Sequence, residues 1–351
     1  MIARLVALVL LVIAPAAAAH PPYGIAADPR ENVYFSDLER VWRLGADGKL
    51  LLFRRQTPNT HVHELRLTPA GDLIGEENRY DPATETFSTA IWRKRGDGSG
   101  NYILPLTNAP PKGSGIWVDE AGNSYTAQWL GNDDRRTILL QRSPTGEVTV
   151  LFGDPKAGAA FRQVLASGIG GMTFGTDGTL VFADGPVLRR LGPEFRVETL
   201  FEGDRTTSLR GIASGPSSTI LAADIGNRRL LSIGRRSAAE TLYRSPAGWL
   251  PTGVASAAGR LWLLEAEDDP EHRSHRVRVV EIVGSKGKVV AVPGEAQLAL
   301  TSTPATATRR GTIAWFAIAA GAFVLALGAA YAVRRARTRR PGEQTRHMKR
   351  A

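Results

Sequence analysis

The sequence predicts an all-β, six-bladed β-propeller, and three observations support this fold class. A short apolar strand, a turn rich in Gly, Asp and Asn, and a second strand recur six times along the chain. Equivalent positions in the six copies are separated by 40, 51, 56, 40 and 42 residues, which matches the repeat length of four-stranded blades. Each copy is generally followed by sequence suited to two further strands. A β-sandwich or a solenoid is the alternative, but even spacing and Gly-rich first strands favour the propeller.

The copies can be followed directly in the sequence. The first pairs residues 23–28 with residues 32–37, and its third and fourth strands are expected at 41–44 and 50–53. The later copies begin at His63, Ser114, Gly170, Arg210 and Thr252. Because one blade cannot bury both of its faces, the blades are expected to pack face to face around an axis. No N-terminal strand remains to complete blade six, so residues 297–300 are the candidates for joining it.

The N-terminus predicts export. Residues 1–19 consist of a basic start at Arg4, an apolar run, a break at Pro15 and a series of alanines. This is the pattern of a cleaved secretory signal peptide, with cleavage expected before His20. An uncleaved anchor helix is the alternative, which the short, proline-broken run disfavours.

The C-terminus predicts a membrane anchor. Residues 311–333 contain no charged side chain and are long enough, at about 1.5 Å per residue, to cross a bilayer. A linker at 301–310 precedes this helix and a basic tail at 334–351 follows it. The positive-inside rule places that tail in the cytoplasm and the propeller, residues 20–300, outside it. The predicted location is therefore a cell membrane, crossed once, with the propeller periplasmic or extracellular in a bacterium.

The net charge of +10 does not indicate nucleic-acid binding. The tail holds eight basic residues and one acid, whereas residues 20–308 hold 33 of each sign, so the excess charge belongs to membrane topology. The chain has no cysteine, which excludes disulfides, thiol catalysis and thiolate metal sites. Motifs for nucleotide phosphates, serine hydrolases and zinc proteases are also missing from the sequence.

Two columns of the aligned blades carry candidate site residues. The column before the first strand reads Tyr23, His63, Ser114, Gly170, Arg210 and Thr252, and these side chains are expected at the axial mouth. The column ending the second strand reads Asp37, Glu77, Gln128, Asp184, Asp224 and Glu265. For the three aspartates, capping of the next turn is the favoured interpretation. Glu77, which is longer, is a candidate ligand residue.

Blade two differs most from the others. It has Glu64 where other blades have glycine, and His61 and His63 lie two residues apart, on the same side of a strand. His61, His63 and Glu77 form a candidate site for a divalent cation, calcium or zinc. A hydrogen-bonded surface cluster is the alternative interpretation. With Trp129 at the rim, the predicted ligand-binding residues are Tyr23, His63, Glu64, Glu77, Arg210 and Trp129.

The blades resemble NHL repeats, and the match is closest at residues 223–230, Ala-Asp-Ile-Gly-Asn-Arg-Arg-Leu. Residues 22–292 resemble the six-bladed superfamily that includes the NHL proteins and the senescence-marker/gluconolactonase-like hydrolases. That resemblance implies the fold. It also implies an axial cation held by a glutamate, two asparagines and an aspartate, but Tyr23 stands where that glutamate is expected and no pair of asparagines lies in the inner columns. The catalytic pattern is therefore not matched.

Two functions follow from these observations. The first is a membrane-anchored extracytoplasmic module that binds a small molecule, glycan or peptide, or a protein partner. The second is a metal-dependent hydrolase of lactones or esters with its axial site on blade two. Convergence of the blade-two residues with Tyr23 and Arg210 favours a functional pocket, and their separation on the outer rim disfavours it.

Overall fold

A computed structural model describes residues 21–55, 59–68, 70–81, 83–84, 86–96, 98–107, 116–119, 121–129, 137–152, 169–192, 196–234, 239–268 and 276–294. Every described residue belongs to one compact unit, Met1–Leu298. The predicted signal peptide (1–19), linker (301–310), helix (311–333) and tail (334–351) lie outside the described residues. Among the residues that are described, no helix has the length and apolarity needed to cross a membrane.

The described strands form six four-stranded antiparallel sheets, each built from four consecutive strands. Blade one contains β1 (Ile25–Ala27), β2 (Val33–Ser36), β3 (Arg40–Leu44) and β4 (Leu50–Arg55). Blade two contains β5 (Thr60–Leu67), β6 (Leu73–Asp81), β7 (Thr86–Lys94) and β8 (Gly100–Thr107). Blade three contains β9 (Ile116–Val118), β10 (Ser124–Trp129), β11 (Thr137–Arg142) and β12 (Val148–Phe152).

The second half of the propeller repeats this order. Blade four contains β13 (Ile169–Phe174), β14 (Leu180–Asp184), β15 (Val187–Leu191) and β16 (Val197–Glu202). Blade five contains β17 (Leu209–Ser214), the short 3₁₀ turn η3 (Pro216–Ser218), β18 (Ile220–Asp224), β19 (Arg229–Ile233) and β20 (Glu240–Arg244). Blade six contains β21 (Trp249–Ala257), β22 (Arg260–Glu267), β23 (Val277–Val283) and β24 (Lys286–Ala291).

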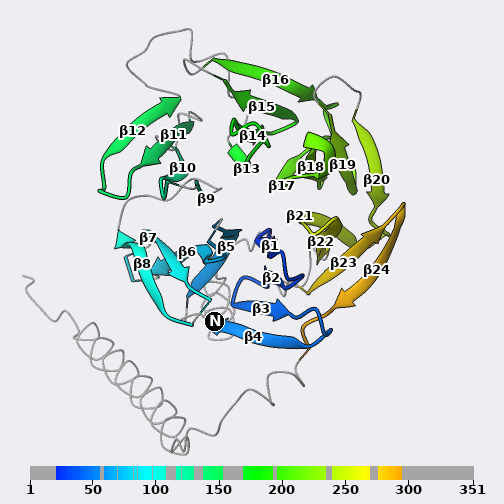
Figure 1. Ribbon diagram of the computed structural model, residues 1–351, viewed down its shortest axis with the longest axis horizontal. Coiled ribbons are helices and arrows are strands. Elements are labelled where there is room, and N and C mark those ends of the chain that lie inside the picture. The colour runs from blue at the N-terminus through cyan, green and yellow to red at the C-terminus, as the bar shows by residue number, and fades with distance from the viewer. Residues whose placement is uncertain are drawn as a thin grey trace, which may run out of the picture. The chain divides into compact units, whose positions relative to one another are not determined.

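The six sheets are arranged around an axis, with the first strand of each blade innermost (Figure 1). The predicted all-β, six-bladed propeller is therefore confirmed. The second strands form the core because they are apolar and buried on both faces: all five residues of β14 and of β18 are buried. Turns of similar form join the inner strands to them. Gly178, with φ of +75°, supplies the left-handed conformation that such a turn requires in blade four.

Glycines in the inner strands let neighbouring blades approach backbone to backbone. A Cβ atom on Gly171 would lie 2.6 Å from the carbonyl oxygen of Arg210, and one on Gly211 would lie 2.5 Å from the Cα of Gly253. A Cβ on Gly253 would lie 2.3 Å from the carbonyl oxygen of Tyr23. Real Cβ atoms do not come this close to backbone, so the junctions between blades four and five, five and six, and six and one require glycine. Blade two has Glu64 at this position.

The ring closes without a shared strand, because blades one and six are each complete from consecutive strands. The closure is apolar packing: Phe35 and Trp42 of blade one share a buried cluster with Trp262 and Val279 of blade six. An ion pair between Glu31 and Arg260 joins the same two blades. The segment 297–300, considered above for ring closure, lies outside the described residues.

Candidate functional site

A cluster of ionisable side chains lies where the inner strands of blades one, two and five begin. Its centre is a pair of glutamates on adjacent strands, since Glu64 of β5 and Glu76 of β6 are direct register partners. Their residues are 0% and 6% exposed. Neither of the Glu64 carboxylate oxygens accepts a hydrogen bond from any described residue. A buried carboxylate without hydrogen bonds is costly for folding, so this pair is a candidate for function rather than for stability.

The glutamate pair holds protons more tightly than ordinary glutamates. Burial raises the pKa of Glu64 to about 7, and the guanidinium groups of Arg66 and Arg210 limit the rise. Burial, followed by the charge of Glu64, raises the pKa of Glu76 to about 8, against the hydrogen bond that Asn78 donates. Two like charges on neighbouring strands cannot both ionise easily in a buried setting. Near pH 7 the pair therefore keeps part of its protons.

Arg66 compensates part of this charge from inside the propeller. Its guanidinium lies 3.2 Å from Glu64 in an ion pair whose members are almost fully buried. The same group donates to the carbonyl oxygen of Met172 in blade four, at 3.0 Å, and lies 5.7 Å from the ring centroid of Trp117 in blade three. Arg66 thus links the inner strands of blades two, three and four. At the other described junctions, neighbouring inner strands meet at glycines.

Two histidines and an asparagine form the next part of the cluster. The rings of His61 and His63 lie 6.1 Å apart, so the predicted proximity of these two side chains is observed. The Nδ2 atom of Asn78 lies 2.9 Å from Nδ1 of His63 and donates to Glu76 at 3.3 Å. Thr89 donates to the carbonyl oxygen of the Asn78 side chain at 2.6 Å, which fixes the orientation of the amide. Burial lowers the pKa of His61, against the charge of Glu39.

Tyr23 and Arg210 bring blades one and five into the cluster. The ring of Tyr23 lies 5.9 Å from that of His63. Burial, followed by the charges of Glu64 and Glu76, raises the pKa of Tyr23 well above its usual value, while Arg210 opposes the rise. Arg210 is exposed and acts on the charges of both Tyr23 and Glu64. Of the predicted ligand residues, Tyr23, His63 and Glu64 therefore lie together, and the charge of Arg210 acts on Tyr23 and Glu64.

Glu77 does not join them. Because successive residues of a strand point to opposite faces, Glu77 and Glu76 lie on different faces of β6. The Glu77 carboxylate accepts from Arg54 of β4 at 2.7 Å, and Arg54 also lies 4.4 Å from the ring centroid of Trp92. Glu77 is thus a structural ion-pair partner between blades one and two.

The cation site predicted from His61, His63 and Glu77 is consequently not assembled. Within the described residues, no group of three or more His, Asp or Glu side chains is arranged to hold a metal ion. The backbone of Trp129 ends β10, and its side chain lies outside the described part of the molecule. His272 and His275, interpreted from sequence as solvated, also lie outside it.

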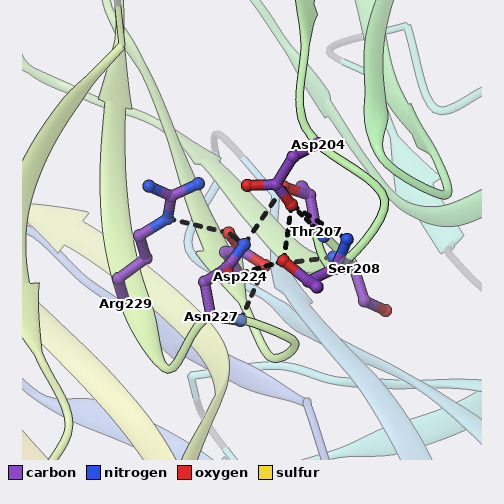
Figure 2. Close-up of polar contacts among 7 residues, drawn as sticks. Asp204, Thr207, Ser208, Asp224, Asn227 and Arg229 are labelled. Atoms are coloured by element: carbon purple, nitrogen blue, oxygen red, sulfur yellow. Dashed lines mark hydrogen bonds and ion pairs between the residues drawn. The ribbon is translucent and has the colours of Figure 1, made fainter.

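The acid column at the end of the second strands is structural, as expected for the aspartates. Figure 2 shows the blade-five example, in which buried Asp224 accepts from the backbone N–H groups of Ser208 and Asn227 and from the side chains of Asn227 and Arg229. In other blades the equivalent acids pair with an arginine of their own sheet: Asp37 with Arg40, Asp184 with Arg189, and Glu265 with Arg278.

Glu76 is not among the site residues predicted from the sequence, although its position in the aligned blades carries a signal. Its column in the second strand reads Ser36, Glu76, Ala127, Ala183, Ala223 and Leu264, so blade two alone has an acid there. Glu64 and Glu76 thus replace glycine and a small or apolar residue at two paired positions of the same blade. Two unusual residues at positions that pair across neighbouring strands are stronger evidence for a site than one unusual residue alone.

A cavity of about 840 Å³ lies at the other ends of the inner strands, and its walls include Leu67, Trp117, Tyr125 and Phe174. Its size suits a small molecule. Asp119, the carboxylate among its described lining residues, already accepts from Asn123 and Tyr125. Tyr23, His61, His63 and Arg210 belong to the other ends of the inner strands, and Arg66 extends from Glu64 toward Trp117 in the cavity wall.

No protein-family model matches the sequence, and no curated protein matches it. The fold is nevertheless shared with solved structures. Regucalcin, a calcium-binding protein from Agrobacterium tumefaciens, has a TM-score of 0.53 at 14% identity, covering 76% of this chain and 93% of that one. A putative gluconolactonase has a TM-score of 0.52 at 14% identity, covering 80% and 96%.

A third similar structure is the aldose sugar dehydrogenase of Streptomyces coelicolor in its PQQ-bound form, with a TM-score of 0.51 at 14% identity, covering 75% and 94%. Identities this low show a common architecture and leave the activity open. These similarities confirm the six-bladed propeller fold that the resemblance implied.

Proposed function

We propose that this protein is a membrane-anchored, extracytoplasmic receptor-like propeller that binds a small polar ligand at the axial mouth beside blade two. The observation that supports this most is Glu64. It occupies a position where packing against the next blade otherwise requires glycine, and it is buried without a hydrogen-bond donor. A residue that costs stability at a strand junction is expected to be retained for recognition or chemistry.

The experiment is a thermal-shift screen of the full-length protein in detergent against a library of polar metabolites. A ligand of the proposed site raises the melting temperature of the wild type because it binds only the folded state. Glu64→Gln and Arg210→Gln are expected to abolish that rise. A set of ligands whose effects persist in both variants would place binding elsewhere.

The anchoring and orientation are a separate part of the proposal, supported by the apolar segment 311–333 and the basic residues after it. The absence of cysteine makes a direct test possible. Ser285 lies in an exposed turn of blade six, so Ser285→Cys should react with a membrane-impermeant maleimide in intact spheroplasts. Thr338→Cys, in the basic tail, should react only after permeabilisation. The reverse pattern would overturn the orientation.

Hydrolysis of a lactone or ester is the second candidate function. It is favoured by one observation, that two buried glutamates, Glu64 and Glu76, are direct register partners. Burial raises their pKa values to about 7 and about 8, the range in which a carboxyl group can act as general base and acid at neutral pH. In this case the turnover of a lactone and ester panel is lost in Glu64→Gln and Glu76→Gln. A divalent cation would have to use these two glutamates rather than Glu77.

A further inference from the structure

The ligand class can be inferred from the groups that the described site leaves without partners, on the basis of the proposed binding function. Glu64 forms an ion pair with Arg66, so its charge already has a partner within the protein. Glu76 accepts only from the Asn78 amide, at 3.3 Å, and no cation is paired with it among the described residues. When it is ionised, Glu76 is thus a buried carboxylate that requires a cationic hydrogen-bond donor.

Arg210 has the opposite requirement. Its guanidinium is exposed, and in the described structure it makes no hydrogen bond and no ion pair. A Cβ on Gly170, at the start of the blade-four inner strand, would lie 3.6 Å from the Arg210 Cδ, so the side chain lies among the starts of the inner strands, where its charge acts on Glu64 and Tyr23. A guanidinium held at the edge of a buried polar cluster is a suitable partner for a carboxylate, which it can bind through two parallel hydrogen bonds.

The charges of the cluster restrict the ligand further. The charges of Glu64, Glu76, Arg66 and Arg210 sum to zero once both acids are ionised, so a ligand that ionises the pair and has no net charge of its own leaves the cluster neutral. A ligand with one positive and one negative group satisfies Glu76 and Arg210 together and keeps the sum at zero. The aromatic ring of Tyr23 and the ring of His63, both 9% exposed as residues, supply the apolar part of the surroundings.

We infer that the axial mouth binds a small zwitterion, an α-amino acid, with its ammonium group directed to Glu76 and its carboxylate to Arg210. The ligand replaces a proton on the acid pair by a cation. Binding therefore releases protons, and the affinity rises with pH as long as the ligand ammonium remains charged. A hydroxyl group in place of the ammonium could accept from or donate to the protonated pair and would not give this pH dependence.

The test uses isothermal titration calorimetry on the full-length protein in detergent. The common L-α-amino acids are titrated singly at pH 6.5 and pH 8.5, together with a matched set on one carbon skeleton: L-alanine, propionate, ethylamine and L-lactate. At least one amino acid is expected to bind about tenfold more tightly at pH 8.5, and to release protons in buffers of different ionisation enthalpy. Analogues that lack the ammonium or the carboxylate should bind at least tenfold more weakly.

Two variants and a control locate the binding. Glu76→Gln keeps the size of the side chain and should weaken amino-acid binding about tenfold while removing its pH dependence. Arg210→Gln should weaken it about tenfold at both pH values. Arg205→Gln is the matched control, because Arg205 is also exposed and unpaired within the described residues and lies outside the cluster. It should leave affinity unchanged.

The outcomes separate this inference from the proposed function. If no amino acid binds but the metabolite screen yields a ligand that Glu64→Gln abolishes, the zwitterion is wrong and the binding site stands. L-lactate binding as tightly as L-alanine, with no pH dependence, would also overturn the zwitterion. If neither experiment yields a ligand dependent on Glu64, Glu76 or Arg210, both proposals are overturned.

Discussion

Blades two and five have the same strand order but use their inner positions in opposite ways. In blade five the inner strand has Gly211 against blade six, the second strand is fully buried, and its acid, Asp224, is saturated with hydrogen bonds (Figure 2). In blade two the glycine position is Glu64, and Glu76 faces it. In blade five the buried acid has hydrogen-bond donors from its own blade. In blade two the two buried acids have only some of the donors that they need among the described residues. A regular blade such as blade five shows which residues the fold requires, and the departures of blade two from that pattern indicate a site.

The largest expected effect comes from giving blade five the residue of blade two. In Gly211→Glu the new Cβ would lie within 2.8 Å of both the Cα of Gly253 and the carbonyl oxygen of Thr252, and it would carry a buried, unpaired charge. We expect a loss of about 4 kcal/mol or more, or no folded protein. Urea denaturation followed by circular dichroism measures it. Gly96→Glu is the control, because Gly96 is exposed, is not among the positive-φ glycines and would place its added Cβ against nothing. A destabilisation no greater than that of the control would contradict the requirement for glycine.

The second largest effect is expected from removing the buried carboxylate of blade five. Asp224→Ala leaves two backbone N–H groups and the side chains of Asn227 and Arg229 without their acceptor. We expect a loss of about 2–4 kcal/mol, since hydrogen bonds to a buried carboxylate are among the stronger ones. Asp204→Ala, on the exposed side of the same network, should cost less. Equal losses for the two variants would show that burial of Asp224 adds nothing.

The third effect concerns the pH dependence of stability in blade two. The folded-state pKa values of Glu64 and Glu76, about 7 and 8, are raised above the ordinary value of 4.5, so the folded protein binds these protons more tightly than the unfolded chain. Their contribution is fully present below about pH 4.5 and is lost as the pH rises through 7 and 8. Glu76→Gln removes that loss.

The melting temperature of Glu76→Gln should therefore exceed that of the wild type by roughly 2–6 °C at pH 8.5, with a smaller difference at pH 5. Differential scanning calorimetry over this pH range measures the difference, and exposed Glu202→Gln serves as the control. A difference that stays constant from pH 5 to 8.5 would mean that Glu76 is ionised in the folded state throughout.

The architecture could be predicted from the sequence because each blade repeats the same local rules. The alternation of apolar positions, the turn residues and the inner glycines identify strands and spacing without long-range information. The same alignment exposed Glu64 as an exception. Closure of the ring was not predictable, because it depends on a buried cluster that contains both Trp42 and Trp262, more than 200 residues apart in the chain.

The site itself could be predicted only in part. The convergence of Tyr23, His63, Glu64 and Arg210 followed from aligning the blades, but the assignment of Glu77 depended on which face of β6 it occupies. That face is fixed by a register shift between Val62 and Glu64 and by Arg54 of the preceding blade, neither of which a local pattern shows. Glu76 and Glu77 are chemically alike and adjacent in the sequence. Their roles differ because their side chains lie on opposite faces of the strand and meet different neighbours.

The smallest expected effect distinguishes these two acids. Glu77→Gln keeps the shape of the side chain and weakens the ion pair with Arg54, so it should cost about 1–3 kcal/mol and leave ligand affinity within a factor of two. Because Glu77 lies apart from the histidines, treatment with a chelator should also shift the melting temperature equally in Glu77→Gln and in the wild type. Elemental mass spectrometry of both proteins provides the direct measurement. About one equivalent of calcium or zinc in the wild type, lost in Glu77→Gln, would restore the cation site predicted from His61, His63 and Glu77 and would make the acid pair a neighbour of a metal rather than the centre of the site.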